Sequence, residues 1–238
     1  MISVCMATYN GEKYIQEQIE SIIMNLSSND EIVISDDGSK DNTIAIIKSY
    51  KNKFPNIKIF KGPGKGVIHN FENAIINADG DLIYLSDQDD IWEANKVETV
   101  NNCFENRKIK LVVHNALIVD GQGKSSGKDF FEFRNSHTGL VKNLLKNSYI
   151  GCCMAFRKNL AREFLPFPEN IEMHDWWIGL VSELTNGSYF LDEQLIRYRR
   201  HDGNVSPMHH HPIGKMVQNR IVLCTELAQR YKLIKNYR

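Results

Sequence analysis

The chain has 238 residues, of which 42% are hydrophobic and 24% are charged, and its 29 Lys and Arg balance 29 Asp and Glu. This length and apolar content allow one large domain, or two merged ones, with a substantial core, and they exclude a disordered chain. A net charge of zero argues against a nucleic-acid binder, which normally carries a basic excess.

We expect neither a membrane-spanning segment nor a signal peptide. No apolar run approaches the roughly 20 residues that cross a bilayer, and no basic segment precedes the first apolar stretch as it would in a signal peptide. The five cysteines are an odd number without metal-ligand spacing, which fits a reducing compartment. We therefore expect a soluble, cytoplasmic protein.

The first half of the chain alternates short apolar runs with helical patterns. Four runs have the length and composition of buried strands, at residues 2–7, 32–34, 57–60 and 82–85. Apolar residues recur at helical spacing between them, at 15–26, 44–50 and 67–78. Strands and helices that alternate with short connections indicate an α/β fold with a parallel sheet covered on both faces.

The second half is less regular. We expect strands at 111–113 and 152–156, one or two strands within 187–200, a turn at 121–127, and helices at 140–146, from 174 and from 215 to the end. There is no internal repeat and no clean linker. A boundary near residue 115 would divide functions more than it divides the fold.

Carboxylates gather at the ends of two predicted strands. Asp36 and Asp37 follow the second strand, and Asp87, Asp89 and Asp90 follow the fourth. Ligands of open parallel sheets bind at the carboxyl ends of the strands. Clustered carboxylates repel one another, and Mg²⁺ or Mn²⁺ bridging substrate phosphates would compensate them. The alternative is that these residues cap turns and helix starts; for the group after the fourth strand we favour metal and ligand binding.

A glycine-rich loop at 62–66 precedes the third helix. Its G-P-G-K-G spacing is neither a dinucleotide fingerprint nor a P-loop. We interpret it as a plain turn, from which Lys65 could still reach a phosphate or a base.

An acidic and aromatic cluster, residues 172–177, opens a predicted helix. Asp175 could serve as a general base for a hydroxyl group, or it could merely complement the helix dipole. Trp176 and Trp177 are adjacent and should point to different faces, so we expect one to be partly exposed. An exposed ring beside a carboxylate would suit a sugar.

Histidines occur near the end of the second half. His201 follows a predicted strand and is either a hydrogen-bonded loop residue or a ligand. The run 209–211 resembles a metal-binding sequence, but we interpret it as a solvated loop beside Pro212.

These motifs occur in the order found in inverting family-2 glycosyltransferases, which the chain resembles over essentially its whole length. The opening M-A-T-Y-N-G at 6–11 is similar to the family's P-T-Y-N start, with Ala7 in place of Pro. D-D-G-S-K-D-N-T at 36–43 and S-D-Q-D-D-I-W at 86–92 resemble its next two motifs. The resemblance implies a GT-A fold, with a Rossmann-like, mostly parallel sheet merged with a smaller mixed acceptor-side region.

The resemblance also implies residue roles. Residues 1–115 would bind the nucleotide-diphosphate sugar donor, through Thr8, Tyr9, Asp36, Asp37, Lys65, Asp87 and Asp89. Asp89 and His201 would hold Mn²⁺ or Mg²⁺. Residues 116–212 would bind the acceptor, with Asp175 as the catalytic base and Trp176 or Trp177 against the sugar.

Three further sequence segments resemble those of bacterial rhamnosyltransferase-type members: I-G-C-C-M-A-F at 150–156, H-D-W-W at 174–177 and Y-R-R-H at 198–201. This implies transfer of rhamnose from dTDP-rhamnose to a hydroxyl of a growing surface polysaccharide or a lipid-linked acceptor. The alternatives are a UDP-hexose-dependent member of the same family and a non-catalytic nucleotide-sugar-binding module.

The C-terminal segment 213–238 should form an amphipathic helix. Apolar residues recur at helical spacing at Val217, Ile221, Cys224, Ala228 and Tyr231. Against the single acid Glu226 stand six bases: Lys215, Arg220, Arg230, Lys232, Lys235 and Arg238. Such a helix can lie on an anionic membrane, here the inner face of the cytoplasmic membrane, and the alternative is a solvated helix face.

Overall fold

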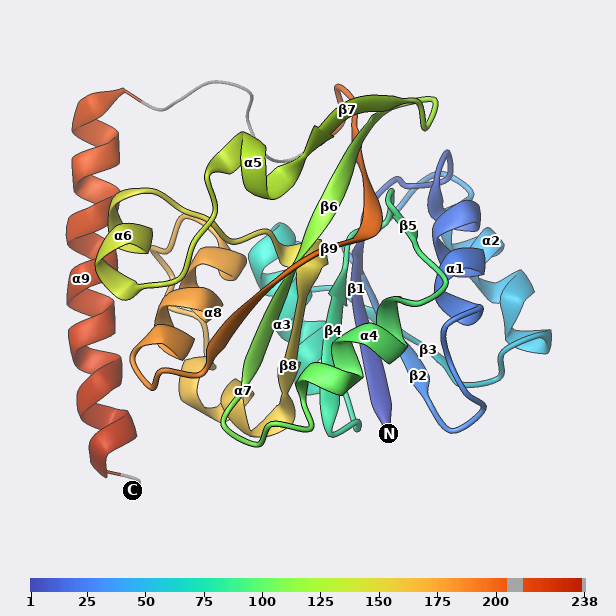
Figure 1. The fold of residues 1–238 in the computed structure, drawn as a ribbon. Coiled ribbons are helices and arrows are strands. Elements are labelled where there is room, and N and C mark those ends of the chain that lie inside the picture. Colours follow the sequence, from blue (N-terminus) through green and yellow to red (C-terminus); the bar gives the residue numbers. More distant parts are fainter. Residues whose placement is uncertain (205–211, 237–238) are drawn as a thin grey trace.

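A computed structural model describes residues 1–204 and 212–236, and it contains one curled nine-stranded sheet (Figure 1). Four parallel strands form its first half, in the order β3-β2-β1-β4. They are β1 (Ile2–Thr8), β2 (Glu31–Asp36), β3 (Ile57–Lys61) and β4 (Leu82–Ser86). All four were predicted, because each is a short, largely apolar run; β1, β2 and β4 are buried on both faces of the sheet, and β3 is a partly exposed edge strand.

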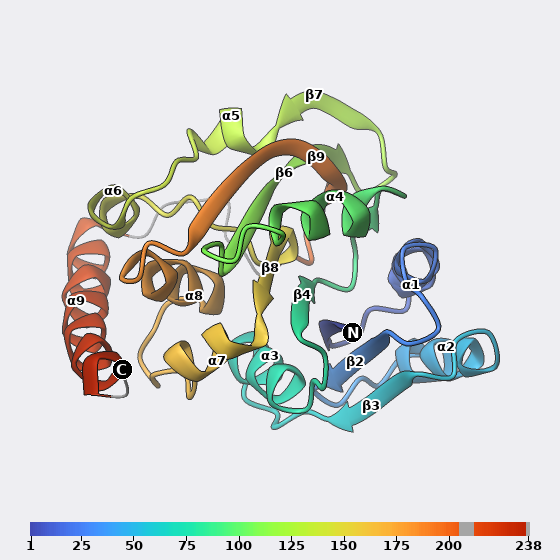
Figure 2. The same cartoon turned by 60° about the horizontal axis from the view of Figure 1, so that its bottom comes forward.

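Helices cover both faces of these strands (Figure 2). On one side lies α1 (Ile15–Ile23), next to α2 (Thr43–Ser49) and a short 3₁₀ helix (Tyr50–Asn52). On the other side α3 (Val67–Ile76) packs on β1 and β2. Right-handed crossovers that move outward from β1 in opposite directions put the helices on opposite faces. The α/β prediction for the first half is confirmed.

The sheet continues through the second half of the chain. β8 (Met154–Arg157) is antiparallel to both β4 and β6 (Leu111–Asp120), so β6 runs in the same direction as the first four strands. The 13-residue β9 (Ser188–Arg200) pairs parallel with β6. Because β6 passes through residue 115, the two halves share one sheet.

Several elements of the second half were not predicted. Two further strands are antiparallel to their partners: β5 (Ile91–Trp92) pairs with β9, and β7 (Ser125–Asp129) pairs with β6. The helices that were missed are α4 (Lys96–Cys103), α5 (Phe130–Arg134) and α7 (Lys158–Phe164). Those that were expected are α6 (Leu140–Leu145), α8 (His174–Glu183) and α9 (Ile213–Asn236). The missed elements are short, and their sequences carry little apolar periodicity.

The last helix packs against the outside of the second half. α9 contacts α6, α7 and α8 through one face that buries Leu223, Leu227 and Ile234. The apolar stripe that predicted this helix lies elsewhere, since Val217, Ile221 and Tyr231 are 53%, 62% and 39% exposed. Within the described residues, no helix combines the length and the apolar character needed to cross a membrane.

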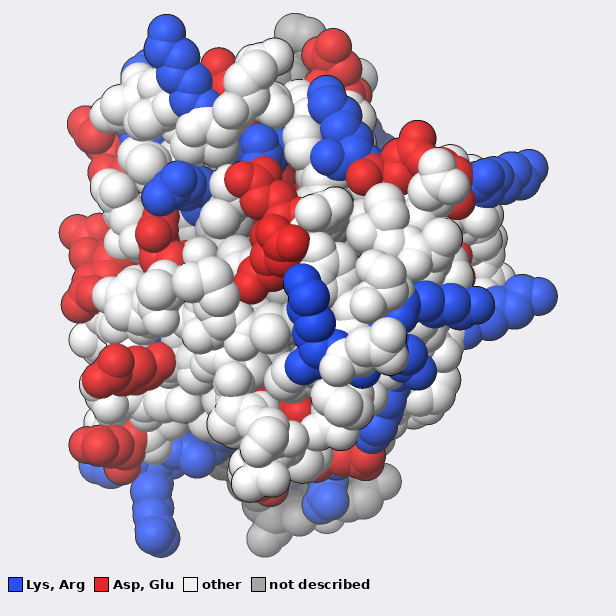
Figure 3. All heavy atoms as spheres, turned by 90° about the vertical axis from the view of Figure 1, so that its right-hand side faces the viewer, with Lys and Arg blue, Asp and Glu red and all other residues white. Residues whose placement is uncertain are grey.

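Two global expectations can be compared with the structure. The five cysteines are free thiols, and three of them, Cys5, Cys152 and Cys153, are buried. Acidic and basic side chains both occur across the face over α1 and α2, in keeping with the balanced net charge (Figure 3).

Candidate functional site

The strand ends that carry the acidic motifs lie side by side. In the sheet register, Thr8 at the end of β1 is opposite Asp36 at the end of β2, and Met6 is opposite Ser86 at the end of β4. The loops that follow these three strands therefore begin at one edge of the sheet. This is the edge at which open α/β sheets bind their ligands.

Asp36 organises the loop after β2. The Thr8 hydroxyl donates to its Oδ2 at 2.8 Å, and the Ser39 hydroxyl donates to the same oxygen at 2.6 Å. Its Oδ1 accepts from the backbone N–H groups of Gly38 and Ser39, at 3.0 and 2.8 Å. The buried carboxylate thus closes a tight turn and fixes the Thr8 side chain.

Asp37 ties this loop to the glycine-rich loop. Its two carboxylate oxygens accept from the N–H groups of Gly64 and Gly66, at 2.9 and 3.0 Å. Each oxygen keeps acceptor capacity for a further donor. Lys65 lies between these glycines, is exposed, and extends from a loop that is, as expected, a turn before α3.

The loop after β1 is joined to the loop after β4. Gln88 accepts from the Tyr9 N–H at 3.0 Å and donates to the Tyr9 carbonyl at 3.1 Å. The buried Gln18 amide donates to the Ser86 hydroxyl at 2.7 Å and to the Asp87 carbonyl at 2.9 Å. The Tyr9 side chain is 54% exposed, so its ring is available to a ligand.

The structure brings together the side chains of Asp89 and His201, the two residues expected to hold a metal. Nε2 of His201 lies 2.9 Å from Oδ2 of Asp89, and the Asn204 amide donates to the same oxygen at 3.3 Å. Burial raises the pKa of the Asp89 carboxyl, while the His201 ring acts in the opposite direction. A carboxylate oxygen that converges with an imidazole nitrogen is a donor set suited to Mn²⁺ or Mg²⁺ completed by phosphate oxygens.

Arg199 is a residue whose role sequence reasoning missed, although it lies within the Y-R-R-H motif. It is 3% exposed, and its guanidinium donates to the Asp89 carbonyl at 2.8 Å and to Glu17 at 2.6 Å. Its backbone N–H donates to Asp90 at 2.9 Å. Arg199 therefore joins β9 to the loop after β4, and His201 follows two residues later.

The inner side of that loop holds a compact group of acids. Ligand atoms of Asp87, Asp90 and Cys152 lie within 4.8 Å of one another. Burial and the neighbouring carboxylates raise the pKa of Asp87 well above its usual range, and burial raises the pKa of Asp90 to about 7. Burial also raises the pKa of the Cys152 thiol.

A lysine that no motif indicated lies beside these acids. Lys96, the first residue of α4, is fully buried, and its Nζ donates to the Cys152 carbonyl at 3.0 Å. The ammonium also lies 3.9 Å from the centre of the Trp92 ring. Burial lowers its pKa to about 8, against the opposing influence of Asp90 and Asp87.

Asp175 lies in the first turn of α8, which begins at His174, as predicted. It is 8% exposed, and its Oδ1 accepts from the Trp176 N–H at 2.6 Å. Burial raises the pKa of its carboxyl to about 6, with the N–H groups of Trp176 and Gly151 acting in the opposite direction. Asp175 is also near enough to Asp87 for its charge to raise the pKa of that carboxyl.

The expectation that one tryptophan is exposed was wrong. Trp176 is 3% exposed and Trp177 is fully buried. Their indole N–H groups donate to the carbonyls of Asn143 and Phe164, at 2.7 and 3.0 Å. Arg220 and Arg230 from α9 lie against the two rings, 5.0 and 5.6 Å from their centres. Because α9 covers this side of α8, neither ring offers a face to a sugar.

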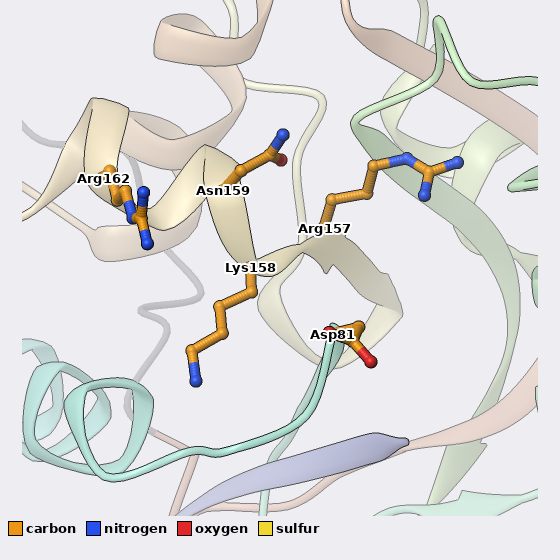
Figure 4. Close-up of a pocket in the computed structure, with 5 residues that line it drawn as sticks. All are labelled: Asp81, Arg157, Lys158, Asn159 and Arg162. Atoms are coloured by element: carbon orange, nitrogen blue, oxygen red, sulfur yellow. The ribbon is translucent and has the colours of Figure 1, made fainter.

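A cavity of about 320 Å³ lies at the other end of β4, away from these groups (Figure 4). It is lined by Asp81, Arg157, Lys158, Asn159 and Arg162. The Arg157 guanidinium turns away from Lys158 and donates to the carbonyls of Ile109 and Phe104. This cavity contains none of the predicted site residues. The histidine run 209–211 falls outside the described residues.

Comparison with known proteins assigns the family. Residues 3–165 match the model of glycosyl transferase family 2. The chain is 30% identical over 217 residues to the dTDP-rhamnosyl transferase RfbG of Shigella flexneri, covering 84% of this chain and 72% of that protein.

Two solved structures are similar in fold. Residues 1–349 of S. aureus TarS, in complex with UDP-GlcNAc, superpose with a TM-score of 0.72 at 20% identity, over 94% of this chain and 66% of that one. Glucosyl-3-phosphoglycerate synthase from Mycobacterium tuberculosis, in complex with Mn²⁺, UDP-glucose and phosphoglyceric acid, gives a TM-score of 0.61 at 17% identity, over 98% and 80%. This chain thus belongs to glycosyl transferase family 2 and has the GT-A fold.

Proposed function

We propose that this chain is an inverting, metal-dependent glycosyltransferase that moves rhamnose from dTDP-rhamnose to a hydroxyl of a bacterial surface polysaccharide or of a lipid-linked acceptor. The single observation that best supports it is that Asp175 lies close to the acidic loop after β4: a Cβ on Gly151 would lie 3.7 Å from that of Asp175, and the next residue, Cys152, has its thiol within 4.8 Å of Asp87 and Asp90 ligand atoms. A base and a nucleotide-sugar site within one cleft are what transfer to a hydroxyl needs.

The residues would divide the work as follows. Thr8, Tyr9, Asp36, Asp37 and Lys65 would surround the nucleotide base, and Asp87 would accept from the ribose hydroxyls. Asp175 would take the proton of the acceptor hydroxyl, whose oxygen then attacks the anomeric carbon on the face opposite the nucleotide. The glycosidic bond to the diphosphate breaks as the new bond forms, so the configuration inverts.

Asp89 and His201 would hold the divalent cation. When bound, Mn²⁺ or Mg²⁺ supplies Lewis-acid stabilisation of the diphosphate leaving group. Asp175 is poised for its own role because its raised pKa, about 6, brings its basicity toward neutral pH while leaving it mostly ionised there.

The identity of the transferred sugar is proposed from similarity to other proteins alone. The resemblance to a dTDP-rhamnosyl transferase at 30% identity favours a dTDP-deoxysugar, and the TarS complex with UDP-GlcNAc favours the second candidate, a UDP-hexose. The buried Trp176 and Trp177 give no support to an aromatic contact with the sugar methyl group.

A donor panel tests both candidates. The purified protein is incubated with dTDP-rhamnose, UDP-hexoses and GDP-mannose in the presence of Mn²⁺ or Mg²⁺, and donor hydrolysis and competitive binding are measured. We expect dTDP-rhamnose to be bound and hydrolysed in preference, with some use of related donors, because apolar discrimination is worth only about 1–3 kcal/mol. Preference for a UDP-sugar would replace the donor and keep the family; binding without any turnover would favour a non-catalytic module.

We further propose a peripheral contact with the inner face of the cytoplasmic membrane. α9 leaves Val217 and Ile221 exposed, and α6, which packs against α9, leaves Val141 and Leu145 each 70% exposed. Arg220 of α9 donates to the Leu145 carbonyl. Exposed lysines on both helices would face anionic lipids. Flotation with anionic vesicles should carry the protein, and replacing Val217 and Ile221 by Ser should reduce it; equal flotation of both proteins would refute the contact.

A further inference from the structure

Among the described residues, Lys96 is unusual because its charged side chain lies inside the protein. Its side chain is fully buried, whereas lysines almost never are unless a partner compensates the ammonium. Of its three donors, one reaches the Cys152 carbonyl at 3.0 Å, and the Trp92 ring lies under the charge at 3.9 Å. A carbonyl and a ring are neutral, so they do not balance the charge.

The balancing charges come from the loop after β4. Asp90 is 1% exposed; its Oδ1 accepts from the Arg199 N–H, and its Oδ2 has no hydrogen-bond partner among the described residues. Burial raises the pKa of Asp90 and lowers that of Lys96, and the charge of each residue opposes the shift of the other. Lys96 and the two carboxylates meet at Cys152: the ammonium lies on its carbonyl at 3.0 Å, and ligand atoms of Asp87 and Asp90 lie within 4.8 Å of its thiol.

The position of Lys96 explains how two carboxylates of the loop 87–90 can lie close together despite their mutual repulsion. Asp87, Asp90 and the Cys152 thiol converge within 4.8 Å, an arrangement that would attract a cation if nothing else were near. The Lys96 ammonium, held on the carbonyl of Cys152 itself, supplies the positive charge from within the chain. The charge of the Asp90 carboxylate is therefore compensated by Lys96 even when no ligand is bound.

We propose that Lys96 is a positioning residue of the donor site: as the internal counter-cation of Asp90, it holds the loop 87–90 so that Asp87 and Asp89 face the donor and its metal. The proposal rests on the proposed function, because it assumes that this loop binds a nucleotide diphosphate.

Hydrogen bonds connect Asp90 to the two residues proposed to hold the metal, Asp89 and His201. Asp90 accepts from the backbone of Arg199, and the Arg199 guanidinium donates to the Asp89 carbonyl. Two residues further along β9 and its loop, His201 meets the Asp89 side chain. A shift of Asp90 would therefore be passed to Asp89 and to His201, although Lys96 contacts neither.

A double-mutant cycle tests the assignment in the full chain. Lys96→Met removes the charge and the donor, Lys96→Gln keeps a donor without the charge, and Asp90→Asn is introduced alone and with Lys96→Met. Binding of dTDP and UDP is measured by calorimetry with and without Mn²⁺. Val100→Ala, a fully buried change in the same helix, is the control for loss of stability alone.

We expect Lys96→Met and Lys96→Gln each to weaken Mn²⁺-dependent nucleotide binding by about 10- to 100-fold, the usual cost of removing a group that supports metal ligands. Asp90→Asn in the Lys96→Met background should recover much of this loss, because it removes the uncompensated charge. If Lys96→Met does not fold, a folded double variant that binds nucleotide supports the proposal.

Three results would overturn it. The first is unchanged nucleotide affinity in Lys96→Met, and the second is an equal loss in Val100→Ala. The third is a double variant that is no better than, or as unfolded as, Lys96→Met. Each leaves the proposed function intact so long as the wild-type protein binds a nucleotide diphosphate; a wild-type protein that binds none refutes the proposed function instead.

Discussion

His201 and Asp89, which are 112 residues apart in the chain, meet through Nε2 and Oδ2 at 2.9 Å. The acid follows β4 in the first half of the sheet, and the histidine follows β9 in the second. If both hold the metal of the donor diphosphate, as proposed, the two halves of the chain contribute to one site.

We expect His201→Ala and Asp89→Ala each to weaken Mn²⁺-dependent binding of a nucleotide diphosphate by about 10-fold or more, because each would remove one metal ligand. Calorimetric titration of dTDP and UDP with and without Mn²⁺ measures this. His69→Ala, which removes a histidine from α3 outside this group of residues, is the matched control. Unchanged metal dependence in His201→Ala would leave this residue as a loop histidine that merely hydrogen-bonds Asp89.

Gly62 packs where a side chain would collide with the end of β2 and the loop that follows it. A Cβ at this position would lie 2.4 Å from Oδ1 of Asp37 and 2.9 Å from the backbone carbon of Asp36. We expect Gly62→Ala to reduce the unfolding free energy by about 1–3 kcal/mol, as overpacking does, and to weaken nucleotide binding. Urea unfolding and calorimetry measure the two effects.

Gly214→Ala serves as the control for this change, because nothing lies within 4 Å of a Cβ at that position in α9. It should be neutral or slightly stabilising, since alanine favours a helix over glycine. Gly62→Ala with wild-type stability and affinity would show that the loop yields easily and does not shape the site.

The sequence allowed the site to be placed but not all of its parts to be assigned. The strand ends with Asp36, Asp37, Asp87 and Asp89 were identified because apolar runs of strand length precede them, and parallel strands bring their carboxyl ends together. Asp175 could be placed at a helix start because apolar residues at helical spacing follow it. These are local patterns joined by one rule of topology.

Lys96 and Arg199 could not be assigned in the same way, because their roles come from burial. Each reads as an ordinary surface cation, and only the packing of α4 and β9 against the acidic loop removes it from water. The exposure predicted for Trp176 or Trp177 failed for a related reason. A helix that begins some 36 residues later in the chain covers them, and no local pattern announces that contact.

The pH dependence of transfer should report the Asp175 carboxyl. Its pKa is raised to about 6, so the base form is lost as pH falls below that value. We expect kcat to fall about tenfold per pH unit below pH 6 and to be level above it. Steady-state rates at saturating donor, from pH 5 to 8, measure this; a level rate down to pH 5 would exclude Asp175 as the base.

The same pKa fixes the sign of a stability effect. The folded carboxyl keeps its proton at a pH where the unfolded one, with an ordinary value of 3.8, has lost it. Asp175 therefore reduces the unfolding free energy as pH rises from about 4 to 6, and the penalty is constant above that window. Asp175→Asn should remove this slope, which urea unfolding across pH 4 to 7 would detect.

Asp175→Asn separates the two interpretations of this residue. If the carboxylate only complements the dipole of α8, its neutralisation should cost up to about 1 kcal/mol of stability and leave transfer intact. If it is the general base, transfer should fall by roughly two to four orders of magnitude, with donor affinity nearly unchanged. In this second case stability at neutral pH should stay level or rise, because a buried charge with a raised pKa is removed and the Asn carbonyl can still accept from Trp176. A variant that folds, binds donor and transfers sugar at the wild-type rate would falsify the assignment of Asp175 as the base.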